Sequence, residues 1–339
     1  MVSTDTQEVG RPARGMVTAY DAYMQGYGRQ FNPNSPIPAN EMRNLFTAYN
    51  QICTKVFEEG KDRVRILDYG CGDGSRFLGT YLEMAKQARA LGKNLDITGY
   101  DISPEAIHLF EKSLTERGFT KNVYNDQKTI FTKDNLKISL VLGKETDSIA
   151  TTKPLLQNGE KQHHLVMSMY GPISHIPTRV GRRAILEMLN DLCSEHFMCT
   201  VPGKGRFRPE RKHYAGLRRN GTPADDATEQ GDLYYSPATS PEQKIFYHVY
   251  AHDELQRDLS ATGFDNVRVG VLSVLPPKHL TWHPWLNLVD GAVSNFASRH
   301  MRHIPEAVLE QAGYFVAHAD KTNSLALSAE GSPVTSILR

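Results

Sequence analysis

The N-terminal part of the chain carries one clear helical pattern, in which apolar side chains recur every three or four positions. This spacing places them on one face of an amphipathic helix, as expected for a helix that packs against a core. We therefore predict a helical cover over residues 15–60, with a turn-rich loop at 32–38, and a flexible polar arm over residues 1–14. The apolar face comprises Met42, Leu45, Phe46, Tyr49, Ile52, Cys53 and Val56.

From residue 61 the pattern changes to short apolar runs that alternate with amphipathic segments. Short apolar runs are typical of the strands of a parallel sheet, and the segments between them predict helices on both of its faces. Ser103 is expected to cap one of these helices, with Pro104 at the first helical position. The pattern predicts an α/β fold with a doubly wound, mostly parallel seven-stranded sheet. Its strands are expected at 64–69, 95–100, 137–142, 164–169, 197–201, 267–275 and 314–318.

This alternation defines one domain over residues 61–321. Two stretches interrupt it and are interpreted as inserts, at about 202–244 and 280–310, and a polar mobile tail follows at 322–339. In open sheets of this kind, ligands bind beyond the carboxyl ends of the strands. Functional residues are therefore expected in the turns that follow the strands.

The balance of charge excludes a polycation, because the net formal charge is +1, with 39 basic and 38 acidic residues. The polar start and the absence of a long apolar run predict a cytoplasmic protein with no membrane partner. The 4 cysteines show no paired spacing, and the 13 histidines show no metal-binding spacing. No metal site is predicted.

A glycine-rich segment joins the first expected strand to the helix that follows it. Its glycines, Gly70, Gly72 and Gly74, permit a tight turn and let a ligand lie against the backbone. The next strand ends in Asp101, a carboxylate placed to accept hydrogen bonds from ribose hydroxyls. A nicotinamide cofactor is disfavoured, because the third glycine comes one residue early and Asp68 would repel a pyrophosphate. The same carboxylate suits a ligand that carries an ammonium group and a sulfonium.

With these motifs the chain resembles the class I, Rossmann-like methyltransferases that depend on S-adenosylmethionine (SAM). The resemblance covers roughly residues 62–275. It rests on the glycine segment at 68–74, on the strand end at 99–103, and on the expected fourth strand at 164–170.

The resemblance implies that SAM is the cofactor and S-adenosylhomocysteine (SAH) the product. In such a protein the three glycines line the methionine part of SAM, Asp101 binds the ribose, and Ile102 packs on the adenine. The adenine amino group is expected to bind near Gly143. The remaining predicted cofactor contacts are Asp68, Cys71, Ser168 and, on an N-terminal helix that folds over SAM in many relatives, Tyr23.

Two residues after the fourth strand are the catalytic candidates. Methyl transfer from a sulfonium is an in-line displacement that depends chiefly on positioning. His175 is predicted to act as a base or to orient the substrate, and the alternative is that it braces the turn. Tyr170 is predicted to shape the pocket.

Substrate contacts are predicted further along the chain. A basic cluster at 204–219 includes Arg206 and Tyr214, and it reads either as a lid that grips an acidic substrate or as a solvated loop. His248 is the third candidate, and the alternative for it is a strand histidine with a hydrogen-bonded partner.

We therefore predict an enzyme that transfers the methyl group of SAM to a nitrogen or oxygen of a small polar metabolite. One alternative is a tRNA wobble-nucleoside methyltransferase, which the basic cluster at 204–219 favours and the near-neutral charge opposes. The other alternative is a SAM-binding module without catalysis.

Overall fold

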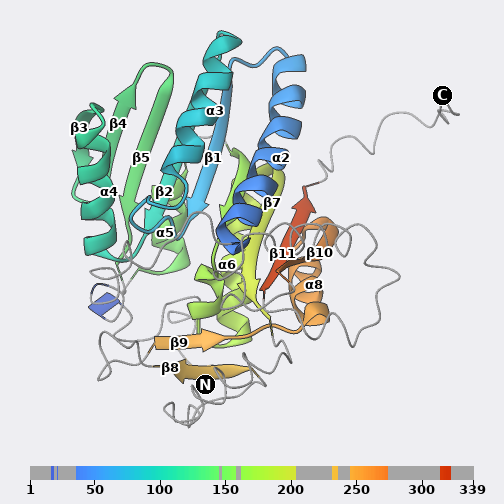
Figure 1. Cartoon of the computed structure of the whole chain (residues 1–339). Helices are drawn as coiled ribbons and strands as arrows, with labels where there is room; N and C mark the ends of the chain where they lie inside the picture. The colour runs from blue at the N-terminus through green and yellow to red at the C-terminus, as the bar shows by residue number, and fades with distance from the viewer. Residues whose placement is uncertain are drawn as a thin grey trace, which may run out of the picture.

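A central sheet organises the molecule, shown in Figure 1 from a computed structural model. Its strands are β1 (Arg63–Tyr69), β2 (Asn94–Asp101), β3 (Thr120–Asn125), β4 (Lys128–Lys133), β5 (Leu136–Leu142), β6 (His163–Ser168), β7 (Cys193–Pro202), β10 (Asp265–Ser273) and β11 (Tyr314–Asp320). The residues that the structure describes are 17–18, 21, 36–144, 147–157, 162–203, 231–235, 245–273 and 314–321.

The strand order in this sheet is β10-β11-β7-β6-β1-β2-β5-β4-β3. Strands β7, β6, β1, β2 and β5 run parallel to one another, and β11 and β10 complete one edge as antiparallel strands. These strands form the mostly parallel seven-stranded sheet that the hydrophobic pattern predicts. Parallel neighbours bring their carboxyl ends to the same edge, which is where the site lies.

The sheet has nine strands rather than seven, because the hairpin of β3 and β4 extends it beyond β5. Every residue of β3 is exposed, so its sequence lacks the alternation of apolar and polar residues that marks a half-buried strand. An exposed edge strand of this kind leaves little signal in the hydrophobic pattern.

Helices cover both faces of the sheet (Figure 1). Side chains from α2 (Pro36–Glu58), α3 (Leu78–Ala90) and α4 (Pro104–Glu116) pack in one apolar core. Side chains from α5 (Ile149–Leu156), α6 (Arg179–Leu192) and α8 (His252–Ala261) pack in the other. Two apolar cores separated by a sheet confirm the doubly wound arrangement.

The N-terminal helix α2 buries the apolar face that its spacing predicts, with Leu45, Tyr49 and Val56 almost fully inaccessible. The helix begins at Pro36, so residues 36–38 of the loop expected at 32–38 are helical instead. Proline is tolerated in the first turn of a helix, where its missing N–H has no intrahelical partner to lose.

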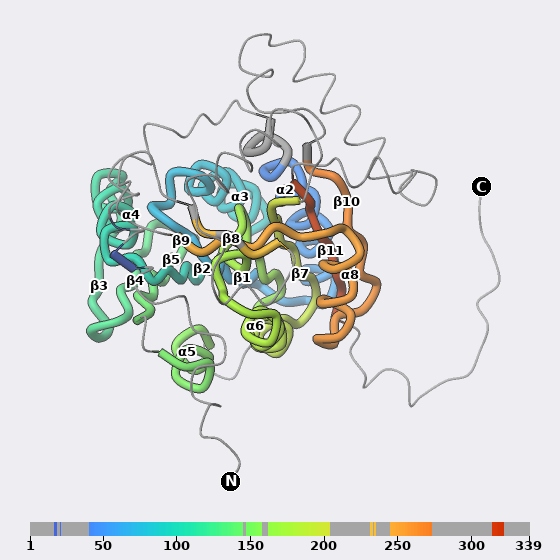
Figure 2. Tube along the Cα trace, turned by 90° about the horizontal axis from the view of Figure 1, so that it is seen from below, coloured from blue at the N-terminus to red at the C-terminus, as the bar shows by residue number. Residues whose placement is uncertain are grey.

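A second, two-stranded sheet pairs β8 (Asp232–Tyr235) with β9 (Ile245–His248). It lies below the main sheet in Figure 1 and in front of the central strands in Figure 2, which looks from below. The 3-10 helix η2 (Pro172–His175) follows β6 and packs against β9. The small sheet therefore lies over the carboxyl edge of the large one.

Several predicted segments lie outside the described residues: the arm at 1–14, the insert at 280–310, the tail at 322–339, and residues 204–230 and 236–244 of the other insert. Among the helices of the described residues, none has the length and hydropathy of a membrane span.

Candidate active site

The glycine turn adopts a backbone conformation that side chains rarely permit. Gly70, Gly72 and Gly74 have φ values of +86°, +58° and +71°, all in the left-handed region. A Cβ on Gly70 would lie 2.3 Å from Cγ of Pro172, and one on Gly74 would lie 2.3 Å from Cε2 of Phe110. The turn is thus built for residues without a side chain, and its N–H groups at 70 and 71 donate to the carbonyl of Tyr100.

Asp68 and Asp101 lie at the carboxyl ends of the neighbouring parallel strands β1 and β2. The Oδ2 atom of Asp101 accepts a hydrogen bond from the N–H of Gly72 at 2.8 Å, and its Oδ1 accepts one from Ser103 at 3.0 Å. The Oδ2 atom of Asp68 accepts the hydroxyl of Tyr81 at 2.5 Å. The two carboxylates therefore flank one turn, as the sequence predicts.

The other carboxylate oxygen of Asp68, Oδ1, is buried and has no hydrogen-bond partner among the described residues. Burial raises the pKa of Asp68 to about 7, opposed by the hydrogen bond from Tyr81 and reinforced by the charge of Asp101. Burial also raises the pKa of Asp101, opposed by the backbone N–H groups that bind it. Two carboxylates held in this way favour a cation beside them. The residues present therefore fit the ammonium and sulfonium of SAM.

The N-terminal segment reaches this place through Asp21. Its Oδ1 accepts the hydroxyl of Ser103 at 2.6 Å and the N–H of Glu105 at 3.3 Å, both at the start of α4. Ser103 is the predicted N-cap, and its Oγ accepts the N–H of Ala106 at 3.0 Å. Tyr23 lies outside the described residues, so its contact with SAM stays a prediction.

The other predicted cofactor residues lie in the same region. Cys71 is buried within the glycine turn, and Ile102 directly follows Asp101. Ser168 is the last residue of β6, and its hydroxyl is buried without a hydrogen-bond partner among the described residues. Ser174 in η2, which the sequence analysis missed, has a hydroxyl in the same condition. Both hydroxyls remain available to a ligand.

Tyr170 lies directly beyond the carboxyl end of β6 in a left-handed conformation, with φ of +67°. Its N–H donates to Oγ1 of Thr200 at 2.5 Å, and its ring centroid lies 3.7 Å from the guanidinium carbon of Arg76. Its ring also stacks on that of Tyr314, with 6.0 Å between centroids. A tyrosine in this backbone conformation is strained, and such strain gathers at functional sites.

His175 lies in η2 and faces β9. Its Nδ1 is 2.8 Å from the carbonyl oxygen of Phe246, so Nδ1 carries the proton and Nε2 is the acceptor nitrogen of the neutral ring. Burial lowers the pKa of His175 to about 4, and the hydrogen bond to that carbonyl opposes the shift. A neutral ring of this kind can orient a substrate, but it is a weak base.

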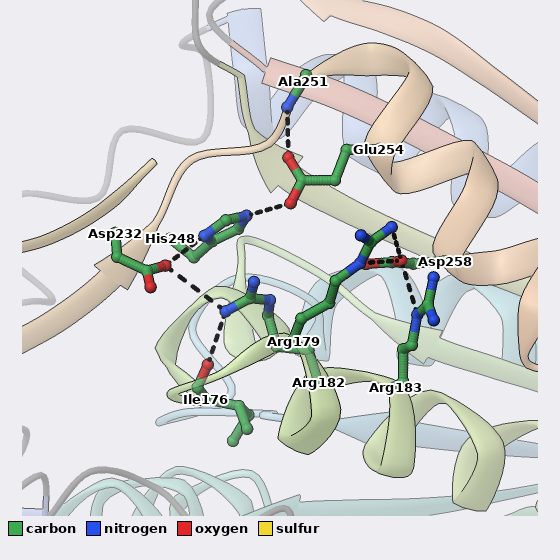
Figure 3. A network of polar contacts seen from close by, with 9 residues as sticks. All are labelled: Ile176, Arg179, Arg182, Arg183, Asp232, His248, Ala251, Glu254 and Asp258. Carbon is green, nitrogen blue, oxygen red and sulfur yellow. Dashed lines mark hydrogen bonds and ion pairs between the residues drawn. The ribbon is translucent and has the colours of Figure 1, made fainter. Parts of the chain in front are cut away.

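His248 is fully buried in the polar network of Figure 3. Its Nδ1 lies 2.6 Å from Oδ1 of Asp232, and its Nε2 lies 2.9 Å from Oε1 of Glu254. Arg182 reaches the same Asp232 oxygen at 3.7 Å. Both ring nitrogens thus face carboxylates, and the geometry gives no support to the prediction that His248 binds substrate. Arg206 and Tyr214, the other two substrate candidates, lie outside the described residues.

A further buried polar group, which was not predicted from the sequence, lies near Asp68. Glu41 in α2 contacts both Arg76, which follows the glycine turn, and Thr200 in β7. One signal for Glu41 was present, because it lies four residues before Leu45 on the apolar face of its helix. A carboxylate at such a position needs a buried partner.

Comparison with protein families gives a match to the family described as "Methyltransferase domain" over residues 60–168. That range runs from β1 to the end of β6 and contains the glycine turn and Asp101. A comparison with proteins of curated function gives no match.

Solved structures of methyltransferases show low similarity to the chain. A SAM-dependent methyltransferase from Methanosarcina mazei is 16% identical, with 77% of this chain and 93% of that chain covered and a TM-score of 0.45. Magnesium protoporphyrin IX methyltransferase from Synechocystis PCC 6803 with bound SAH is 13% identical, with 91% and 96% covered and a TM-score of 0.43. A phosphoethanolamine N-methyltransferase from Haemonchus contortus is 15% identical, with 80% and 52% covered and a TM-score of 0.39.

The family match and the cradle define the class of protein. Residues 60–168 are a methyltransferase domain, set in a doubly wound Rossmann-like sheet with its glycine turn at the carboxyl edge. The chain therefore contains a methyltransferase domain, and the glycine turn and the two carboxylates in that domain fit SAM.

Proposed function

We propose that the chain transfers the methyl group of SAM to a nitrogen or oxygen of a small polar metabolite. The observation that carries the proposal is the cradle of Asp68 and Asp101, with one buried carboxylate oxygen that has no hydrogen-bond partner among the described residues. The small sheet of β8 and β9 lies over the carboxyl edge, and this cover favours a small substrate over a macromolecule. The buried hydroxyls of Ser168 and Ser174 supply polar groups there.

The residues of the chain have separate tasks in this proposal. Asp68 and Asp101 hold the cofactor, with Asp68 beside positive charge and Asp101 on the ribose. SAM supplies an activated methyl group when bound. Tyr170 and His175 lie on the β6 side of the turn, where they position the acceptor in line with the methyl group. The weak basicity of His175 suits an amine that attacks as its free base, because such an acceptor needs no proton removed beforehand.

Calorimetry tests the cofactor part. We expect SAM to bind and NADH not to bind. Asp101→Ala should weaken SAM binding by about 100-fold or more, since each lost hydrogen bond to a charged group contributes roughly 1.5–3 kcal/mol. Asp96→Ala is the matched control, because Asp96 is a buried carboxylate earlier on β2 that pairs with Arg63 at 3.0 Å. Folded protein that does not bind SAM would disprove the proposal.

Label transfer tests the substrate part. Protein is incubated with methyl-labelled SAM and either a desalted small-molecule extract or purified tRNA. We expect the label in the small-molecule fraction. Label recovered in nuclease-sensitive tRNA would show that the substrate is a tRNA nucleoside and not a small metabolite. Bound SAM without transfer to either pool would favour a module without catalysis.

A further inference from the structure

We propose that Glu41, Arg76 and Thr200 form a clamp that positions Tyr170 for methyl transfer. This inference rests on the proposed function, because it assigns positioning residues to that reaction. The clamp joins α2, the segment after the glycine turn and β7 to the end of β6. None of these three residues belongs to a motif that the sequence analysis identified.

The clamp is centred on the carboxylate of Glu41, which is fully buried. Its Oε2 accepts a hydrogen bond from Nε of Arg76 at 2.8 Å and lies 2.5 Å from a terminal nitrogen of the same guanidinium. Its Oε1 accepts the hydroxyl of Thr200. Arg76 is 8% exposed and Thr200 is fully buried, so solvent hardly reaches these contacts.

Both partners of Glu41 hold Tyr170. The Oγ1 atom of Thr200 accepts the N–H of Tyr170 at 2.5 Å, while its own proton is donated to Glu41. The carbonyl of Thr200 accepts the N–H of Gly171 at 2.9 Å. The guanidinium of Arg76 lies over the Tyr170 ring at 3.7 Å. The carboxylate of Glu41 therefore holds both the backbone of Tyr170, through Thr200, and its ring, through Arg76.

The conformation of Tyr170 explains the need for a clamp. A left-handed backbone is unfavourable for a residue with a Cβ, so the surrounding contacts must hold it there. Hydrogen bonds to Thr200 at two consecutive residues, 170 and 171, do this. The ring then lies at the carboxyl edge of the sheet, one strand from Asp68, because β6 is the neighbour of β1.

A contribution to stability explains the buried pair of Glu41 and Arg76 less well than a positioning role does. The cost of removing two charges from water often exceeds what a buried ion pair returns, and apolar side chains frequently replace such pairs without loss. The charges of Arg76 and Glu41 also act on the pKa of Asp68 in opposite directions, with Arg76 lowering it and Glu41 raising it. Apolar side chains in place of Glu41 and Arg76 could preserve stability, but they could not hold Tyr170 in position.

The test uses Thr200→Val, which removes the hydroxyl at nearly constant shape and leaves every charge in place. Single-turnover transfer of labelled methyl is measured at saturating SAM with the small-molecule extract as acceptor. We expect the rate to fall on the order of 10- to 100-fold, as for small misplacements of reacting groups. The dissociation constant for SAM should stay within about twofold. Thr200→Ser, which keeps the hydroxyl, should recover most of the rate.

Asp258→Asn is the matched control. Asp258 is a buried carboxylate that pairs with Arg179 and Arg183 in the network of Figure 3, on α8 and α6. We expect this variant to lower the melting temperature and to leave the transfer rate unchanged. The clamp is overturned if Thr200→Val transfers methyl as fast as the unaltered protein, or if Asp258→Asn slows transfer equally. A chain that binds SAM but transfers no methyl before any substitution would instead refute the proposed function.

Discussion

The carboxyl group of Asp68 is buried at the end of β1, where only one of its oxygens has a hydrogen-bond partner among the described residues. Its pKa of about 7 means that the free protein binds a proton there in mildly acidic solution. A cationic ligand prefers the carboxylate, so SAM binding lowers this pKa and releases that proton. The protonation of one residue is thus linked to cofactor affinity.

This linkage predicts a pH dependence. As the pH falls below 7, SAM affinity should fall by roughly tenfold per pH unit, because binding must displace one proton. Calorimetry at pH 6 in buffers of different ionisation enthalpy measures the proton released. Asp68→Asn cannot ionise and should bind SAM weakly at every pH, with no proton release. The same release from the asparagine variant would assign the proton to another group.

His175 is tested by its effect on turnover. We expect His175→Ala to lower turnover about 10- to 100-fold and to leave SAM affinity within about twofold, since the ring orients the acceptor. With its pKa at about 4, its ionisation should not appear in the pH profile of turnover between pH 6 and 8. His252→Ala is the control, because His252 is also bonded to a backbone carbonyl, that of Val269. Equal effects of the two substitutions on turnover would indicate that His175 only stabilises the turn after β6.

At the scale of elements, the network of Figure 3 joins the small sheet to the helices. Asp232 on β8, His248 on β9, Glu254 on α8 and Arg182 on α6 form a continuous line of contacts. This line of polar contacts adds to the buried apolar side chains of Ile245 and Phe246, through which β9 also packs.

Removing a member of this network should lower the stability of the fold more than it lowers the rate of methyl transfer. His248→Ala leaves Asp232 and Glu254 without their shared partner, and we expect a loss of about 3–5 kcal/mol in the free energy of unfolding. Urea denaturation measures it. Asp253→Ala provides the control, since its exposed pair with Arg257 should contribute at most about 1 kcal/mol. A His248→Ala protein of unchanged stability with weakened substrate binding would restore the predicted substrate contact.

The elements differ in how far the sequence predicts them. The glycine turn and Asp101 were predictable because a local pattern of residue types encodes them. The clamp was not, because Glu41 and Thr200 are separated by 159 positions and only the fold brings them together. His248 shows the opposite case, because a histidine that was predicted to contact substrate lies in a buried polar network. The β3–β4 hairpin was not predicted, because every residue of β3 is exposed and its sequence shows no apolar pattern.

At the scale of the whole molecule, the near-neutral charge bears on the choice of partner. A net charge of +1 gives the protein no general attraction to a polyanion, so we expect weak RNA affinity unless a local cluster of basic residues contacts the phosphates. We expect excess tRNA not to inhibit methylation of the small-molecule extract. Competition measured at two salt concentrations checks this. Strong inhibition that weakens steeply with salt would point to the basic cluster at 204–219 and to an RNA substrate.

The turn of the β3–β4 hairpin contacts the loop that follows β5. The side-chain amide of Gln127 donates to the carbonyl of Leu142 at 3.3 Å and to Asp147 at 3.2 Å. Gly143, in that loop, donates to the carbonyl of Asp101 at 2.8 Å. The β3–β4 hairpin therefore braces the segment beside Asp101, the residue proposed to bind the ribose. If the adenine binds near Gly143 as predicted, shortening Gln127 loosens the loop around a nucleobase without changing the glycine turn, which would suit cofactor analogues with a bulkier base.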